Sequence, residues 1–338
     1  MLRETEETFD RNSREVLAEV QKRYGIEPGD LKRLGSFASF VFEYRYRGVD
    51  RVLRITPGSH RSVDQIRGEL EWMNYLNDSG VSVIRGLPSN RGLLVEPIEI
   101  EPTGPATDNL YSVVSFTRAP GAGPAREVWN ANLFKVWGQT IGRMHAATKD
   151  YRPSDPALRR HTWYEDEDLC GREHIPPDQN AVRQKYDSLM KYLRSLPTPP
   201  DAFGVVHEDM HHGNFFVDDG RITVFDFDDC QYHWFAADLS IPLFYVMRNK
   251  VLNDRSTEFA RHFFGCLMEG YNRENSISRK WLEQIPCFLK LREMILYIII
   301  YAEGIQDSDE WCRDFMENRR ERIEKDIPVV DIDFSQFA

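Results

Sequence analysis

The chain has 338 residues, 41% of them hydrophobic, which is enough to bury the core of one compact protein or of two lobes. Its 54 acidic and 43 basic residues give a net charge of −11, which disfavours nucleic acid as a partner because phosphate backbones are bound by basic patches. The longest apolar run, residues 294–302, is too short to cross a bilayer, so we expect a buried helix there and no membrane association.

The cysteines and the first residues predict the compartment. The 5 cysteines are odd in number and widely spaced, and they form no C-x-x-C pair, which argues against a disulfide framework and a sulfur-rich zinc site. The acidic start, residues 1–7, lacks the basic and apolar parts of a secretory signal. We therefore expect a cytoplasmic protein with reduced thiols.

The N-terminal third predicts a small sheet with one helix. Residues 32–44 are typical of a strand, a small-residue turn and a second strand, and residues 50–56 form an apolar run interrupted by a single cation, Arg54. Residues 63–77 have apolar side chains at helical spacing. Residues 112–121 predict a strand that ends at a Pro-Gly break.

The remainder is helical in character. Residues 133–148 place their apolar side chains on one helical face, and His145 lies near the end of this segment. A lone histidine at a helix end is more often a satisfied polar group or a C-terminal charge than a ligand. We therefore assign His145 a structural role.

The stretch from Val205 to Asn214 concentrates polar chemistry and fits two different reactions. His207-Glu208-x-x-His211 matches the H-E-x-x-H string of zinc hydrolases, which requires both histidines on one helix. The flanking runs, residues 203–206 and 213–217, are typical of short strands and leave no room for such a helix. The zinc interpretation is therefore the weaker one.

The second interpretation is phosphoryl transfer. The Asp-Gly step in residues 218–221 predicts a tight hairpin between strands at 215–217 and 222–225. This hairpin would bring Asn214 and Asp226 together beside Asp209 on the preceding loop. Amide and carboxylate oxygens of this kind suit Mg²⁺, and the spacing reproduces the logic of the kinase catalytic loop.

With these motifs the chain resembles the aminoglycoside phosphotransferase-like branch of the protein-kinase-like superfamily, whose members are small-molecule kinases. The resemblance lies in the pattern His207, Asp209, His212-Gly213-Asn214, Asp226 and Asp238. It implies an α+β, two-lobed protein-kinase-like fold with an antiparallel sheet and a helix in the small N-terminal lobe. It also implies a larger, mostly helical C-terminal lobe. We expect a nucleotide-clamping lobe with its hinge at 1–118 and a catalytic and substrate lobe at 119–338.

The resemblance also implies roles for residues of the small lobe. Arg54 stands where the family has its phosphate-binding lysine, and Glu69 is our choice as its partner, although Glu71 remains an alternative. The turn at Ser36 would cover the ATP phosphates. The segment from Phe116 through Thr117 to Ala119 resembles the hinge whose backbone receives adenine.

In the larger lobe, the resemblance implies that Asp209 positions and deprotonates the acceptor hydroxyl, while Asn214 and Asp226 hold Mg²⁺. Asp228 is a second metal candidate, because alternation in an extended segment turns it to the same side as Asp226. His207 is expected to brace the loop. Asp238 resembles the family aspartate that caps a helix and ties down the catalytic loop.

We therefore predict an ATP- and Mg²⁺-dependent kinase that phosphorylates a hydroxyl of a small molecule. An aminoglycoside, another aminated metabolite and an uncharged alcohol all remain as acceptors, and the oligomeric state is left open. Two other functions are alternatives: a nucleotide-binding regulatory module, in which Arg54 in place of lysine marks lost chemistry, and the zinc hydrolase.

Overall fold

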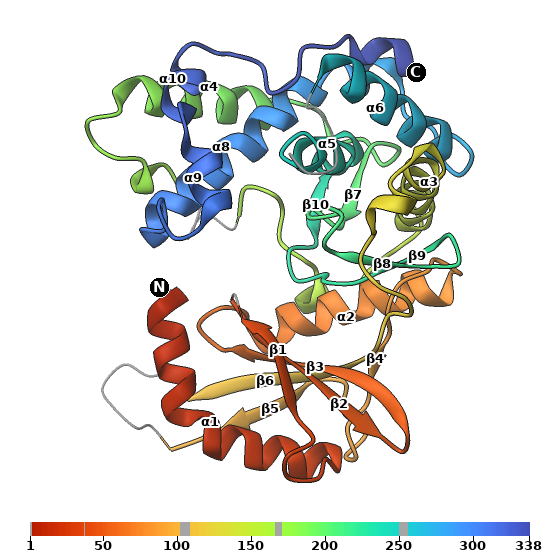
Figure 1. Cartoon of the computed structure of the whole chain (residues 1–338), viewed down its shortest axis with the longest axis vertical. Helices are drawn as coiled ribbons and strands as arrows, with labels where there is room; N and C mark the ends of the chain where they lie inside the picture. Colours follow the sequence, from red (N-terminus) through yellow and green to blue (C-terminus); the bar gives the residue numbers. More distant parts are fainter. Residues whose placement is uncertain (1, 37, 102–108, 166–170, 250–255) are drawn as a thin grey trace. The chain divides into compact units, whose positions relative to one another are not determined.

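The computed structural model describes residues 2–36, 38–101, 109–165, 171–249 and 256–338, without the side chains of residues 2–4 and 36 (Figure 1). Two compact units are present. The first comprises Met1–Pro120, Tyr151–Arg160 and Thr223–Asp228, and the second comprises Gly121–Asp150, His161–Ile222 and Asp229–Ala338. In the described part of the chain, no helix combines the length and the apolar character needed to cross a membrane.

An antiparallel sheet forms the centre of the first unit. Its order is β1-β2-β3-β6-β4, and β5 also pairs with β6. The strands are β1 (Lys32–Ser36), β2 (Phe40–Tyr46), β3 (Val49–Pro57), β4 (Gly86–Leu87), β5 (Glu96–Glu99) and β6 (Leu110–Thr117). The strands predicted within 32–44 and 50–56 are therefore confirmed, and so is the strand that leads to the Pro120-Gly121 break, which ends at Thr117.

Two helices, α1 (Leu2–Tyr24) and α2 (Val63–Asp78), cover opposite faces of this sheet (Figure 1). The face toward α1 is apolar: Phe9 stacks on Phe40 with ring centroids 3.7 Å apart, and Leu53 and Ile55 belong to the same buried cluster. Because side chains alternate along a strand, Arg54 points to the other face, toward α2. Our sequence interpretation anticipated α2 but not α1.

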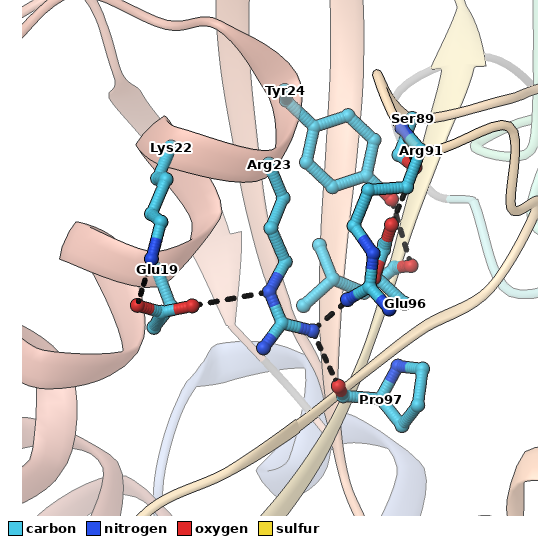
Figure 2. A network of polar contacts seen from close by, with 9 residues as sticks. Glu19, Lys22, Arg23, Tyr24, Ser89, Arg91, Glu96 and Pro97 are labelled. Carbon is cyan, nitrogen blue, oxygen red and sulfur yellow. Dashed lines mark hydrogen bonds and ion pairs between the residues drawn. The ribbon is translucent and has the colours of Figure 1, made fainter.

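A buried carboxylate ties α1 to the sheet. Glu96 is fully buried and accepts hydrogen bonds from Ser89 Oγ, from Arg23 Nη1 at 3.2 Å and from Arg91 Nη1 at 3.3 Å (Figure 2). Arg23 also donates to Glu19 on its own helix at 3.2 Å. A buried charge is tolerated only when it is paired and hydrogen-bonded, so Glu96 needs these donors.

The second unit is mostly helical. Its helices are α3 (Ala131–Thr148), α4 (Asn180–Arg194), α5 (Phe235–Val246), α6 (Thr257–Tyr271), α7 (Arg279–Leu282), α8 (Ile285–Glu303), α9 (Glu310–Met316) and α10 (Arg319–Glu324). Two small sheets are also present: β7 (Phe203–Val206) pairs with β10 (Gln231–Trp234), and β8 (Phe215–Asp218) pairs with β9 (Arg221–Val224), whose last two residues belong to the first unit. An N-terminal antiparallel sheet followed by a mostly helical part confirms the predicted α+β class.

Close packing of α3 on α6 depends on two glycines. A Cβ added to Gly138 would lie 1.8 Å from the Leu267 carbonyl oxygen, and one added to Gly270 would lie 1.8 Å from that of Lys135. Neither position can hold a side chain without separating the helices.

The longest apolar run lies within α8, as expected.

The predicted hairpin is present between β8 and β9. Its two turn residues, Asp219 and Gly220, have φ values of 46° and 72°. Positive φ at both central residues is the requirement of the tight hairpin turn that an Asp-Gly step favours.

The Glu96 contacts predict unequal costs for two neighbouring substitutions. Glu96→Gln should lower the free energy of unfolding by about 2 kcal/mol, because charged hydrogen bonds in a buried site are lost. Glu19→Gln, which removes the more exposed carboxylate from the same Arg23, should cost below about 1 kcal/mol. Urea unfolding of both variants provides the measurement, and equal costs would show that Glu96 does not anchor α1.

Candidate active site

In the first unit, Arg54 forms a two-point ion pair with α2. Its Nη1 lies 2.9 Å from Glu69 Oε1, and its Nη2 lies 2.5 Å from Glu69 Oε2. The predicted choice of Glu69 as the partner is confirmed. Glu71 is engaged elsewhere, since it accepts hydrogen bonds from the Tyr151 hydroxyl at 2.9 Å and the Ser154 amide at 2.9 Å. A bidentate pair fixes the guanidinium in orientation as well as position.

Asp228 lies on the same guanidinium. Its Oδ1 is 3.7 Å from Arg54 Nη1, and its Oδ2 is 2.8 Å from His60 Nε2 and 3.5 Å from Arg61 Nε. Burial alone would raise the pKa of Asp228, but His60, Arg54 and Arg61 outweigh it and lower the pKa well below its ordinary value. The Asp228 carboxylate therefore faces cations of the protein on both oxygens.

Arg54 also packs on β6, since its guanidinium carbon lies 5.4 Å from the centre of the Phe116 ring. Burial would lower the pKa of Arg54, but Glu69 and Asp228 raise it above its ordinary value, so the side chain keeps its charge. Only 6% of Arg54 is exposed. The site thus contains a permanently charged, rigidly held cation.

The other predicted nucleotide-binding residues of this unit have simple surroundings. The Thr117 amide donates to the Arg85 carbonyl at 2.9 Å, and the Thr117 hydroxyl oxygen accepts from the Arg85 amide at 2.9 Å. Ala119 is buried. The backbone of Ser36 pairs with Phe40 in the sheet, whereas its side chain lies outside the described part of the structure.

In the second unit, residues 207–214 form an irregular loop between β7 and β8. The helix that a zinc site would need is absent from this described segment, so His207 and His211 do not share a helical face. His207 is fully buried, and its Nδ1 accepts a hydrogen bond from the Asp209 amide at 3.3 Å. The predicted bracing role of His207 agrees with this contact.

Asp238 fastens the loop to the helices. Its Oδ1 accepts from the Glu208 amide at 2.8 Å, and its Oδ2 lies 2.9 Å from His145 Nε2. His145 is fully buried, and its Nδ1 lies 3.1 Å from the Tyr271 hydroxyl. These contacts match the predicted tie and the structural role of His145. The predicted helix cap is wrong, because Trp234 occupies the N-cap position and Asp238 lies inside the first turn of α5.

The Asp209 carboxylate is held on both oxygens. Oδ2 accepts from Asn214 Nδ2 at 2.9 Å and lies 3.2 Å from His211 Nε2, while Oδ1 forms an ion pair with Arg292 Nη2. Burial would raise the pKa of Asp209, but Arg292 and His211 outweigh it and lower the pKa below its ordinary value. Asp209 is therefore ionised and fixed in orientation.

Arg292 is the site residue that sequence reasoning missed. It lies on α8, 83 positions after Asp209, and no motif surrounds it. The signal in the sequence was a group of three charged residues, Lys290, Arg292 and Glu293, in a strongly apolar helix, and such residues need partners when the helix is buried.

Two acidic residues, one in each unit, have left-handed backbones: Glu208 with φ 68° and Asp226 with φ 66°. Such conformations are costly for non-glycine residues and cluster at functional sites. Glu208 is buried, and its Oε2 has no hydrogen-bond partner among the described residues. Burial raises the pKa of Glu208 to about 8.

The available oxygens fit a hard divalent cation. Asn214 Nδ2 is used twice, on the carbonyl oxygen and on Oδ2 of Asp209, each at 2.9 Å, which leaves the amide oxygen as the group that can bind a metal. Asp226 is exposed on the loop that follows β9. Amide and carboxylate oxygens, supplemented by water and substrate phosphates, are ligands that Mg²⁺ accepts, so each of these two groups suits such an ion by its own chemistry.

Comparisons with known proteins agree with this chemistry. Residues 30–271 match the model of a phosphotransferase enzyme family. The chain is 38% identical over 326 residues to the amicoumacin kinase of Bacillus subtilis (strain 168). The aligned region covers 96% of each chain.

Solved structures extend the comparison to the fold. An amicoumacin kinase in complex with AMP-PNP, Ca²⁺ and Ami matches all of both chains with a TM-score of 0.92 and 34% identity. A microcompartment-associated aminopropanol kinase matches 92% of this chain and 98% of its own, with a TM-score of 0.70 and 19% identity. At that identity the second match shows the fold alone.

The raised pKa of Glu208 predicts a pH-dependent effect of Glu208→Gln. The Glu208 carboxyl has a pKa of about 8 in the folded protein and of 4.5 in the unfolded chain. Its contribution to the free energy of unfolding is therefore complete below pH 4.5 and is lost as the pH rises toward 8. The variant should therefore gain stability over the parent, and the gain should be larger at pH 8.5 than at pH 6. Urea unfolding at the two pH values measures it.

The expected difference between the two gains is at least about 1.4 kcal/mol, the equivalent of one pKa unit. Glu173→Gln, on a largely exposed side chain of the same unit, is the control and should show no such difference. Equal gains at both pH values for Glu208→Gln would show that the carboxyl titrates normally in the folded protein.

Proposed function

Because the chain belongs to the phosphotransferase enzyme family, we propose that it transfers the γ-phosphoryl group of ATP to a hydroxyl of amicoumacin or of a closely related antibiotic. The observation that carries this proposal is the 38% identity to an amicoumacin kinase along 96% of both chains. The complex of an amicoumacin kinase with AMP-PNP, Ca²⁺ and Ami supports it from a second protein, at 34% identity.

The wider predictions made from sequence are confirmed at this level. The chain is a small-molecule kinase with an alcohol group as acceptor, as the pattern around Asp209 indicated. The alternative of a regulatory module without chemistry was based on Arg54 in place of a lysine. This reason is weakened, since Arg54 keeps a bidentate carboxylate partner and its charge.

In the proposed reaction, the acceptor oxygen attacks the γ-phosphorus while the bond from that phosphorus to the ADP oxygen breaks. The acceptor proton passes to the Asp209 carboxylate. A carboxylate with a low pKa is a weak base, but phosphoryl transfer has a loose transition state and needs orientation more than base strength. Asp209, fixed on both oxygens, supplies that orientation.

The first unit would supply positive charge for the nucleotide. Arg54 would pair with the ATP phosphates, and Glu69 with Asp228 would hold the guanidinium in place. We assign Asp228 to this anchoring role in preference to metal binding, because two guanidinium groups and the His60 imidazole already surround its carboxylate. Since the Thr117 amide is used within the protein, the backbone at 118–119 is the part of the hinge left to receive adenine.

Asn214 and Asp226 would hold Mg²⁺, for which the Ca²⁺ of the solved kinase complex is the nearest parallel. The ion would neutralise charge on the phosphates during transfer. The protein's part is to present the Asn214 oxygen, which it does by binding the amide nitrogen to Asp209.

Asp209→Asn should lower kcat for amicoumacin phosphorylation by about 10²–10⁴-fold, the usual contribution of a positioned proton acceptor. Coupled ADP release and mass spectrometry of the product provide the measurement. Asp218→Asn, on an exposed carboxylate of β8, is the matched control and should leave kcat within about twofold of the parent. Full activity of Asp209→Asn would refute the assigned role.

Glu69→Gln should raise the KM for ATP by about tenfold, because Arg54 loses the carboxylate that orients it. Glu71→Gln changes a residue two positions away on the same helix that bonds Tyr151 and Ser154, so its KM for ATP should stay close to that of the parent. Steady-state kinetics with varied ATP compare the two variants. If both shifted KM equally, orientation of Arg54 would not be the cause.

A further inference from the structure

Arg292 is a buried cation whose contacts converge on Asp209. Its side chain lies on α8 and is 9% exposed. One nitrogen, Nη2, bonds both the Asp209 carboxylate and the Tyr245 hydroxyl, the latter at 2.6 Å. The guanidinium carbon lies 5.2 Å from the centre of the Tyr245 ring. The geometry joins three elements of the second unit: the loop, α5 and α8.

This arrangement is not optimal for stability. Arg292 Nε is buried and has no hydrogen-bond partner among the described residues, and an unmade buried hydrogen bond carries a desolvation cost. Buried ion pairs are in general weak evidence for stability, because desolvation offsets much of the attraction. A role in holding Asp209 explains why a charge with an unused donor is kept at this position.

The contacts of Asp209 show what such a role would be. Asn214 and His211 both lie on Oδ2, so without Arg292 the other oxygen would have no partner among these contacts. Rotation of the carboxylate about its last bond would then be restrained on one side only. With Arg292 in place both oxygens are held, and the side chain still keeps 18% of its surface exposed.

We propose that Arg292 is a positioning residue for phosphoryl transfer, which fixes the Asp209 carboxylate in the orientation that receives the acceptor hydroxyl. The inference rests on the proposed role of Asp209. Tyr245 holds the guanidinium through its hydroxyl and its ring face. A planar guanidinium can meet the hydroxyl, the ring and the carboxylate together, which a lysine ammonium cannot do in the same way.

Misorientation by about 1 Å can cost about 10²-fold in rate, so Arg292→Ala should lower kcat by about that factor. The KM for ATP should stay within about threefold, because Arg292 makes no proposed contact with the nucleotide. Arg292→Lys, which keeps the charge and much of the volume, should recover only a small part of kcat. Tyr245→Phe should lower kcat less than Arg292→Ala, since the ring remains.

Chemical rescue separates positioning from a structural role. Millimolar guanidinium, far below denaturing concentrations, should restore part of the kcat of Arg292→Ala by occupying the vacated position. The matched control is Arg319→Ala. Arg319 is also buried, pairs with Glu293, the neighbour of Arg292 on α8, and lies 4.4 Å from the centre of the Phe315 ring. This variant should lose stability, keep its kcat and show no response to guanidinium.

Both amicoumacin phosphorylation and slow ATP hydrolysis, with water as the acceptor, should be measured in every variant. If the parent phosphorylates no amicoumacin, the proposed acceptor is wrong, and the hydrolysis rates still test Arg292. A decrease in Arg292→Ala that guanidinium restores supports the inference in either assay. An unchanged rate, or a decrease that guanidinium does not restore although the variant is folded, would overturn it.

Discussion

The loop of residues 207–214, which carries the proposed catalytic Asp209, depends on one buried carboxylate. One oxygen of Asp238 accepts a hydrogen bond from the Glu208 amide, and the other binds His145. Asp238 and His145 are both completely buried. A buried charge must be fully paired, so loss of either contact would leave the Asp238 carboxylate incompletely paired. The two contacts hold Glu208 in a left-handed conformation that it would otherwise avoid, and the next residue in the chain is Asp209. The strain at Glu208 is thus maintained by α3 and α5, which carry His145 and Asp238.

Each unit holds one charged group in a fixed orientation, a cation in the first unit and an anion in the second. In the first unit, two carboxylates hold the Arg54 guanidinium. In the second, Arg292, Asn214 and His211 hold the Asp209 carboxylate. This division suits phosphoryl transfer, in which the protein contributes position and charge and forms no covalent bond of its own. Arginine in place of the family's usual lysine is compatible with it, because Glu69 and the guanidinium match in geometry.

The family and the proposed acceptor rest on similarity of different extent. The family follows from the match of residues 30–271 to the phosphotransferase model, and a kinase at 19% identity shares the fold. The proposed acceptor depends instead on identity along nearly the whole length, which includes helices that carry no motif. The net charge of −11 allowed several acceptor classes and did not choose among them. Fold-level similarity alone would not have chosen either.

The sequence by itself determined the local structure and the family, and it predicted the chemistry of the loop. Alternation and helical spacing predicted the strands and α2, and the Asp-Gly step predicted the hairpin, because both depend on neighbours in the chain. The motif predicted roles for Asp209, Asn214 and Asp226, which remain predictions, and the β-branched flanks argued against the helix that a zinc site requires.

Only the tertiary structure decided which charges meet. It placed Arg292 on Asp209 across 83 positions and put His60 and Arg61 around Asp228. It also showed that Asp238 lies in the first turn of α5 and not at the predicted helix cap. These contacts follow from how helices and loops pack, and a cation's partner is set by distance in space and by burial. Neither quantity can be read from the spacing of residues along the chain.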